Sequence, residues 1–83
     1  MKSYSLVINV ILKSGKEKTY ISYSPKALTK EEVMKISGEF ENLIESVYKE
    51  EALGSIAFKV SPDKEIMINT KEIALIEFEI VEL

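Results

Sequence analysis

Residues 4–12 read YSLVINVIL, and their side chains alternate in a way that predicts a β-strand. In a strand, every second side chain points to the same face. One face would carry the larger apolar residues, Tyr4, Leu6, Ile8, Val10 and Leu12, and the other would carry Ser5, Val7, Asn9 and Ile11. The segment therefore predicts a strand with a core face and a second face that is also partly apolar.

A second strand is predicted directly after this one. The four residues KSGK, 13–16, include Gly15, which can adopt the positive φ angle that tight turns need. Residues 17–23, EKTYISY, are rich in aromatic and β-branched side chains, which is typical of strands. Residues 4–23 are therefore expected to form an antiparallel hairpin.

The sequence changes character after this hairpin and predicts one long helix. Thr29 and Glu32 have the spacing of a capping box, in which each side chain bonds the backbone N–H of the other residue. Beyond them, apolar residues recur at steps of three and four, which places them on one side of a helix. This pattern predicts a helix over residues 30–52, and Gly54 is expected to end it. Gly38 lies inside the helix, where it would either allow close packing on a sheet or mark a kink.

Three further strands follow the predicted helix. Residues 55–60, 65–70 and 73–80 alternate between apolar and polar side chains, and short connections join them. The element order is thus β-β-α-β-β-β in a single domain, residues 1–83. Because the links between strands are short, chain neighbours should pair antiparallel. We expect a two-layer α+β fold: one antiparallel five-stranded sheet with one long helix packed on one face.

One helix would cover only one face of such a sheet, and the other face is too apolar to remain bare. By the alternation of the strands, four apolar residues point away from the core side: Val7, Ile11, Met67 and Leu75. A contiguous apolar patch of this kind usually marks a partner surface. The sequence therefore predicts a homodimer, formed through a sheet face or an edge strand, or contact with another protein. The alternative is a monomer whose sheet curls and buries both faces.

Glu77 and Glu79 form the candidate acidic site. In a strand they would lie on one face about 6.6 Å apart, at roughly 3.3 Å per residue, near the separation of paired carboxylates in glycoside hydrolysis. Catalysis by such a pair needs a pocket that raises the pKa of one acid, and a two-layer domain of 83 residues has little room for one. We therefore interpret the two glutamates as the solvated side of a strand, without a metal.

The residue inventory excludes several kinds of site. The chain has no cysteine and no histidine, which removes disulfides, the usual zinc sites, thiol nucleophiles and the commonest general base. No nucleophile elbow and no phosphate-binding loop occurs. We expect a non-enzymatic protein without cofactors. A signal-peptide cleavage pattern and an apolar segment of membrane length are also absent, which predicts a soluble, cytoplasmic protein without membrane contact.

The net charge of −3 is unevenly distributed along the chain. Residues 1–35 hold seven lysines and three acidic residues, net +4, whereas residues 36–83 hold four lysines and eleven acidic residues, net −7. Lysines cluster with an aromatic residue around the first turn, at Lys13, Lys16, Lys18 and Tyr20. Such a set can follow a nucleic-acid strand, which is the alternative function. The acidic total and the absence of arginine make nucleic acid the less expected partner.

Two segments carry a resemblance to known proteins: VILKSGKEKTYIS, residues 10–22, and IMINTKEIALIEFEI, residues 66–80. They are similar to the ends of small α+β proteins of Gram-positive bacteria and their phages. In those proteins a Lys-Ser-Gly hairpin opens the chain, and an Ile-x-Ile-Asn-x-x-x-Ile-x-x-Ile-Glu motif closes it. The resemblance implies a bacterial or phage origin. It implies no activity, so it assigns no functional residues.

Overall fold

The computed structural model describes residues 2–48 and 54–83 of the chain. The elements, in chain order, are β1 (Tyr4–Leu12), β2 (Glu17–Ile21), α1 (Lys30–Tyr48), β3 (Ser55–Ser61), β4 (Lys64–Asn69), the short 3-10 helix η1 (Thr70–Glu72) and β5 (Ile73–Glu82). The predicted α+β class and the order β-β-α-β-β-β are confirmed. The predicted helix end at residue 52 lies outside the described residues.

β1 and β2 form the predicted hairpin around a glycine turn. Gly15 donates its backbone N–H to the carbonyl of Leu12 at 2.9 Å and has a φ angle of 93°. Leu12 in turn donates its N–H to the carbonyl of Lys16 at 2.8 Å. A three-residue turn with a left-handed glycine matches the natural twist of two antiparallel strands. The turn sets the pairing further along the hairpin, where Val7 lies opposite Ile21.

α1 begins at the predicted capping box. The Thr29 N–H donates to Glu32 Oε1 at 3.1 Å, and the Glu32 N–H donates to Thr29 Oγ1 at 3.2 Å. These bonds satisfy two of the N–H groups that a helix start leaves without partners. α1 continues through Gly38, and a Cβ added there would meet no atom within 4 Å. This glycine therefore does not serve close packing on the sheet.

The predicted single five-stranded sheet is wrong. The structure has a three-stranded sheet in the order β2-β1-β5 and a separate two-stranded sheet, β3-β4. All pairs are antiparallel, as predicted. β4 does not pair with β5, its neighbour along the chain. Instead β5 pairs along the whole length of β1, from Tyr4 opposite Glu82 to Leu12 opposite Ile73.

The short helix η1 separates β4 from β5 and accounts for this difference. Asn69 Oδ1 accepts the N–H of Lys71 at 3.0 Å and caps the turn. Thr70 is buried and bonds the carbonyl of Gly54 through both its N–H and its hydroxyl, at 3.0 and 2.9 Å. The alternation of residues 65–70 predicts a strand through Thr70, but these bonds hold that residue in a turn. The chain leaves the turn in a new direction, so β5 enters the other sheet.

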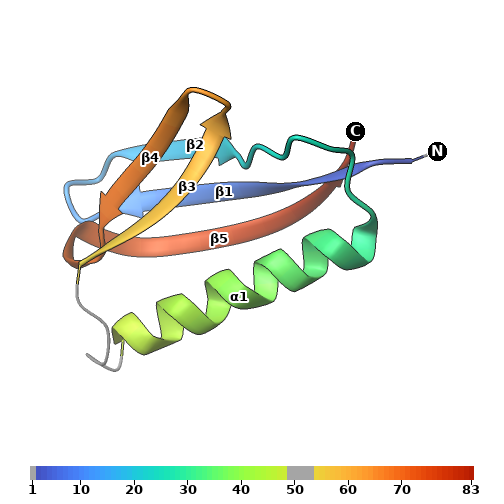
Figure 1. The fold of residues 1–83 in the computed structure, drawn as a ribbon. Coiled ribbons are helices and arrows are strands. Elements are labelled where there is room, and N and C mark those ends of the chain that lie inside the picture. Colours follow the sequence, from blue (N-terminus) through green and yellow to red (C-terminus); the bar gives the residue numbers. More distant parts are fainter. Residues whose placement is uncertain (1, 49–53) are drawn as a thin grey trace.

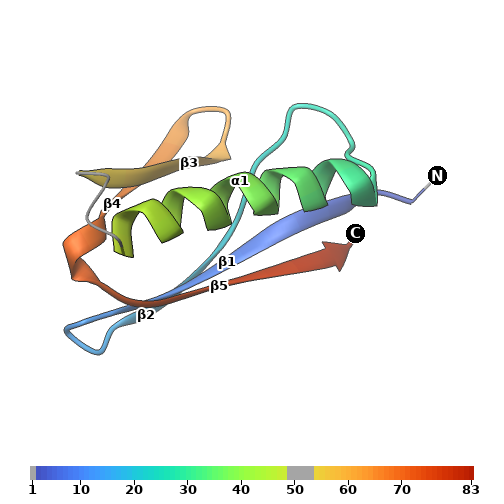
Figure 2. The same ribbon diagram turned by 90° about the horizontal axis from the view of Figure 1, so that it is seen from below.

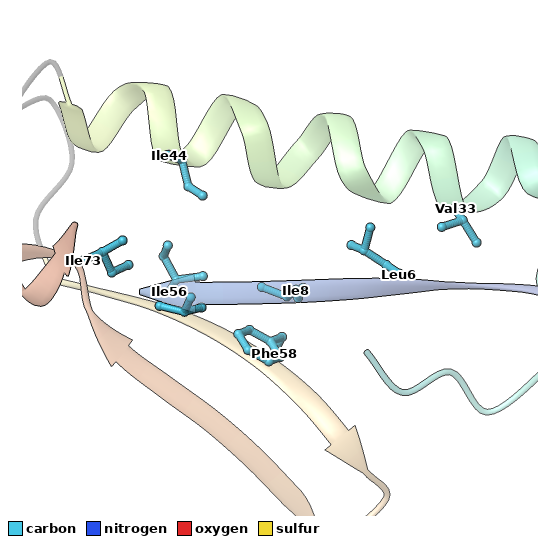
Figure 3. Close-up of a cluster of buried hydrophobic side chains, with 8 residues drawn as sticks. Leu6, Ile8, Val33, Ile44, Ile56, Phe58 and Ile73 are labelled. Atoms are coloured by element: carbon cyan, nitrogen blue, oxygen red, sulfur yellow. The ribbon is translucent and has the colours of Figure 1, made fainter. Parts of the chain in front are cut away.

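α1 and the β3–β4 hairpin lie on the same side of the three-stranded sheet (Figure 1; Figure 2). The core lies between them and the sheet, and its buried apolar residues are Leu6, Ile8, Val10, Val33, Ile44, Ile56, Phe58 and Ile73. Val33 and Ile44 point from α1 toward β1, and Ile56 and Phe58 lie along β3 (Figure 3). Among the described residues, no element covers the opposite face of the three-stranded sheet. The sheet therefore does not curl to bury both faces.

Candidate functional site

The uncovered side of the three-stranded sheet is the candidate site, and we call it the outer face. Strand pairing arranges its residues in rows across β5, β1 and β2. Its apolar members are Val7, Ile11, Ile21, Leu75 and Val81. Its polar members are Ser5, Asn9, Glu17, Thr19, Glu77 and Glu79. The outer face is thus a mixture of apolar and acidic groups without a lysine.

Three of the four apolar residues that the sequence analysis proposes lie on the outer face. Ile11 is paired with Leu75, whose side chain is 46% exposed, and Val7 lies further along β1. Met67 belongs to the other sheet. It lies opposite Ala57 on the solvent side of the β3–β4 hairpin and is 69% exposed. The structure therefore brings Val7, Ile11 and Leu75 together and leaves Met67 apart.

Ile21 is a member of the outer face that the sequence analysis misses. Its side chain is 56% exposed and lies directly opposite Val7. The alternation of residues 17–23 does not by itself tell which of its two faces is buried. The length of the turn could have indicated which face Ile21 occupies, because a three-residue loop sets the register of the hairpin and pairs Ile8 with Tyr20. Ile21 must then point the same way as Val7.

A polar band crosses the middle of the outer face. Asn9 Nδ2 donates to carboxylates on both neighbouring strands, at 3.1 Å to Glu17 Oε1 and at 3.3 Å to Glu77 Oε1. Asn9 Oδ1 accepts the hydroxyl of Thr19 at 3.0 Å. The amide thereby uses both of its N–H donors and links three strands. The band also divides the apolar residues of the outer face into two groups.

Glu77 and Glu79, the predicted acidic pair, both project from β5 onto the outer face and are exposed. Glu77 accepts the bond from Asn9, and Glu79 lies opposite Val7. A shallow hollow of about 320 Å³ surrounds them. Across residues 2–48 and 54–83, no group of three or more acidic side chains is arranged to hold a metal ion. The two carboxylates, with Glu17, make the outer face negative.

The lysine cluster of the alternative function is divided between two places. Lys13 and Lys16 are exposed in the turn between β1 and β2. Lys18 and Tyr20 instead line a groove of about 470 Å³ between β2 and β4. The Tyr20 ring is half-buried and packs edge-on against Phe58, with a centroid distance of 5.4 Å. This ring is therefore engaged in the core rather than displayed beside the turn lysines.

No helix in the described part of the chain combines the length and the hydrophobicity that a membrane span requires. Comparison of the chain with protein-family models, with curated proteins and with solved structures gives no significant match.

Proposed function

We propose that the chain is a non-enzymatic protein-interaction module that self-associates through its outer face. The observation that carries the proposal is the set of exposed or half-buried apolar residues that no described element covers: Val7 and Ile21 on one side of the Asn9 band, and Ile11 and Leu75 on the other. Apolar surface that extends across several strands usually marks a site of protein contact. If the outer faces of two copies met, these side chains of both copies would be shielded from water.

The size of the outer face can be compared with the sizes of known protein–protein interfaces. Three strands about 4.8 Å apart, with a mean length of about eight residues at roughly 3.3 Å per residue, give a face of about 14 by 26 Å. That is about 370 Å² per copy, whereas a standard interface buries about 800 Å² per partner. We therefore expect a weak, transient dimer rather than an obligate one.

Carboxylates on the outer face oppose this dimer. Glu17, Glu77 and Glu79 of each copy would approach those of the other, and no lysine of the outer face lies between them. Salt weakens repulsion between exposed charges, because the screening length falls from about 30 Å at 0.01 M to about 3 Å at 1 M ionic strength. Association is therefore expected to strengthen as the salt concentration rises, which is the reverse of an interface held by ion pairs.

Sedimentation velocity over a range of protein concentrations up to about 1 mM tests the proposal. The average mass should rise toward that of a dimer, and should rise more at about 0.5 M than at about 0.05 M sodium chloride. Leu75→Glu should abolish the rise. Met67→Glu is the matched control, because Met67 is also exposed but lies on the other sheet. A protein that stays monomeric under all these conditions would refute self-association.

A further inference from the structure

β5 is an edge strand, and α1 extends past its free side. β1 pairs with one side of β5, and no strand among the described residues pairs with the other. In Figure 1 β5 lies between β1 and α1, and in Figure 2 α1 stands to one side of the sheet plane. A further strand placed next to β5 would therefore lie beneath α1.

The pairing of β5 with β1 identifies the backbone groups on its free side. Leu83 donates its N–H to the carbonyl of Ser3 at 2.9 Å. Because N–H and C=O groups alternate in direction along an antiparallel strand, the odd-numbered residues of β5 direct theirs toward β1. Ile76, Phe78 and Ile80 then direct theirs to the free edge. The side chains of these three residues face the core side and are half-buried.

A shallow groove of about 560 Å³ follows this edge between the second half of α1 and β5. Its apolar lining comes from Ile44, Leu75, Ile76 and Phe78, and its acidic lining from Glu41, Glu45 and Glu77.

The same side of α1 continues toward the start of the helix. Gly38 lies three residues before Glu41, and Met34 lies four residues before Gly38, so both share the side of α1 that carries Glu41. Met34 is 54% exposed, and Gly38 has open space where a side chain would be. The side of α1 above the edge is therefore accessible over several turns.

The charges around the free edge of β5 indicate which kind of strand can pair with it. Glu77 and Glu79 lie along β5 on the outer face, and none of the described residues that line the groove on the α1 side is a lysine. A second copy of β5 fits poorly, because antiparallel pairing centred on Phe78 would set glutamates directly opposite glutamates. Like charges opposite each other destabilise a sheet, whereas opposite charges stabilise it. A strand whose lysines lie on the outer face would place opposite charges beside Glu77 and Glu79, and its pairing with β5 would therefore be favourable.

We propose that the free edge of β5 binds an extended segment of a partner protein in which lysine and apolar residues alternate. The segment adds to the sheet as an antiparallel fourth strand, and its backbone bonds those of Ile76, Phe78 and Ile80. Its apolar side chains enter the groove beneath α1. Its lysines lie on the outer face beside Glu77 and Glu79. This binding does not depend on whether the outer face also forms a dimer.

Fluorescence anisotropy with a labelled peptide of alternating lysine and valine, added to the whole chain, tests the inference. The peptide should bind, and the same peptide with glutamate in place of lysine should not. In the bound geometry the valine N–H groups face β5 and the lysine N–H groups face solvent. N-methylation of the valines should therefore abolish binding, whereas N-methylation of the lysines should be tolerated.

Charge reversal on the protein supplies the matched variants. Glu77→Lys combined with Glu79→Lys should weaken the lysine peptide about tenfold and permit the glutamate peptide to bind. Glu39→Lys reverses a single charge on a different side of α1, and both peptides should bind this variant as they bind the unchanged chain. Binding that survives N-methylation of the valines, or that Glu39→Lys weakens equally, would overturn the proposal in favour of diffuse charge attraction.

Discussion

Asn9 is the residue that sets the character of the outer face. Its amide bonds Glu17 on one side and Glu77 on the other, so a single side chain ties three strands together. It also interrupts the apolar surface between Val7 and Ile11. A one-residue slip of either neighbouring strand would break these bonds. Asn9 therefore favours one pairing of the strands. It also limits non-specific association through the uncovered face of the sheet.

Gly38 is expected to be a site where stability can be gained. A glycine in a helix interior costs about 1 kcal/mol relative to alanine. A Cβ at this position meets no atom within 4 Å. Gly38→Ala should therefore raise the free energy of unfolding by about 1 kcal/mol, as measured by urea denaturation.

Gly15 provides the matched control for this substitution. A Cβ at Gly15 also meets no atom within 4 Å, but the φ angle is +93°, which side chains with a Cβ rarely adopt. Gly15→Ala should lower the free energy of unfolding by about 1 kcal/mol. The same sign of effect for both substitutions would contradict the view that backbone conformation, and not space, distinguishes the two glycines.

At the scale of single elements, the start of α1 makes stability depend on pH. The hydrogen bond from the backbone N–H of Thr29 lowers the pKa of Glu32 below its ordinary value of 4.5, desolvation opposes this, and Lys26 lowers it further. A carboxyl group whose pKa is lower in the folded chain stabilises the fold above the unfolded value. That stabilisation is lost as the pH falls through the folded pKa.

Nuclear magnetic resonance titration should therefore find a Glu32 pKa below 4.5. Unfolding measured at neutral pH and at about pH 3 should show a smaller acid-induced loss of stability in Glu32→Gln than in the unchanged chain. Lys26→Met is the control, because it removes the ion pair at 3.5 Å but keeps the stronger effect of the Thr29 N–H. An ordinary pKa for Glu32 in the unchanged chain would exclude the capping explanation.

Most single elements follow from local sequence, and the exception is instructive. The alternation of β1, the turn at Gly15 and the capping box at Thr29 each act over a few neighbouring residues, and the structure confirms all three. Thr70 differs because its bonds go to Gly54, which lies 16 positions earlier. A contact over this distance in the chain cannot be predicted from the pattern of neighbouring residues. The expected strand through Thr70 therefore ends one residue sooner, at Asn69.

At the scale of the whole molecule, the β3–β4 hairpin depends on its attachment to the other elements. The Tyr23 N–H donates to the carbonyl of Lys59 at 2.7 Å, next to the end of β2. The ring of Phe58 meets those of Tyr20 and Phe40, at centroid distances of 5.4 and 6.2 Å. A two-stranded hairpin is only marginally stable by itself. Phe58 therefore joins the hairpin to both the sheet and the helix.

Loss of this contact should be among the most damaging changes in the chain. Phe58→Ala is expected to lower the free energy of unfolding by about 3–5 kcal/mol. A domain of this size has a total of only roughly 4–12 kcal/mol, at about 0.05–0.15 kcal/mol per residue. Met67→Ala on the solvent side of the same hairpin should change it by less than about 0.5 kcal/mol. Equal losses in urea denaturation would mean that the hairpin is not docked through Phe58.

The candidate surfaces were predictable only in part. The outward direction of Val7, Ile11 and Leu75 follows from alternation within one strand each. Their assembly with Ile21 on one face depends on how β2 and β5 pair with β1. Which side of β5 is free could not be anticipated, because the expected pairing of chain neighbours placed β5 beside β4 and not beside β1.

The sequence by itself determined the α+β class, the order of the elements, the first hairpin and the start of the helix, because periodicity, capping and turn residues act over short distances. Only the tertiary structure decided that β5 joins β1, with Asn9 and Glu77 in contact across 68 positions, and that β3 and β4 stand apart as a second sheet. Which distant strands pair depends on the total apolar surface that one arrangement buries. The buried apolar surface is a property of the whole fold, so it cannot be calculated from any single segment of the sequence.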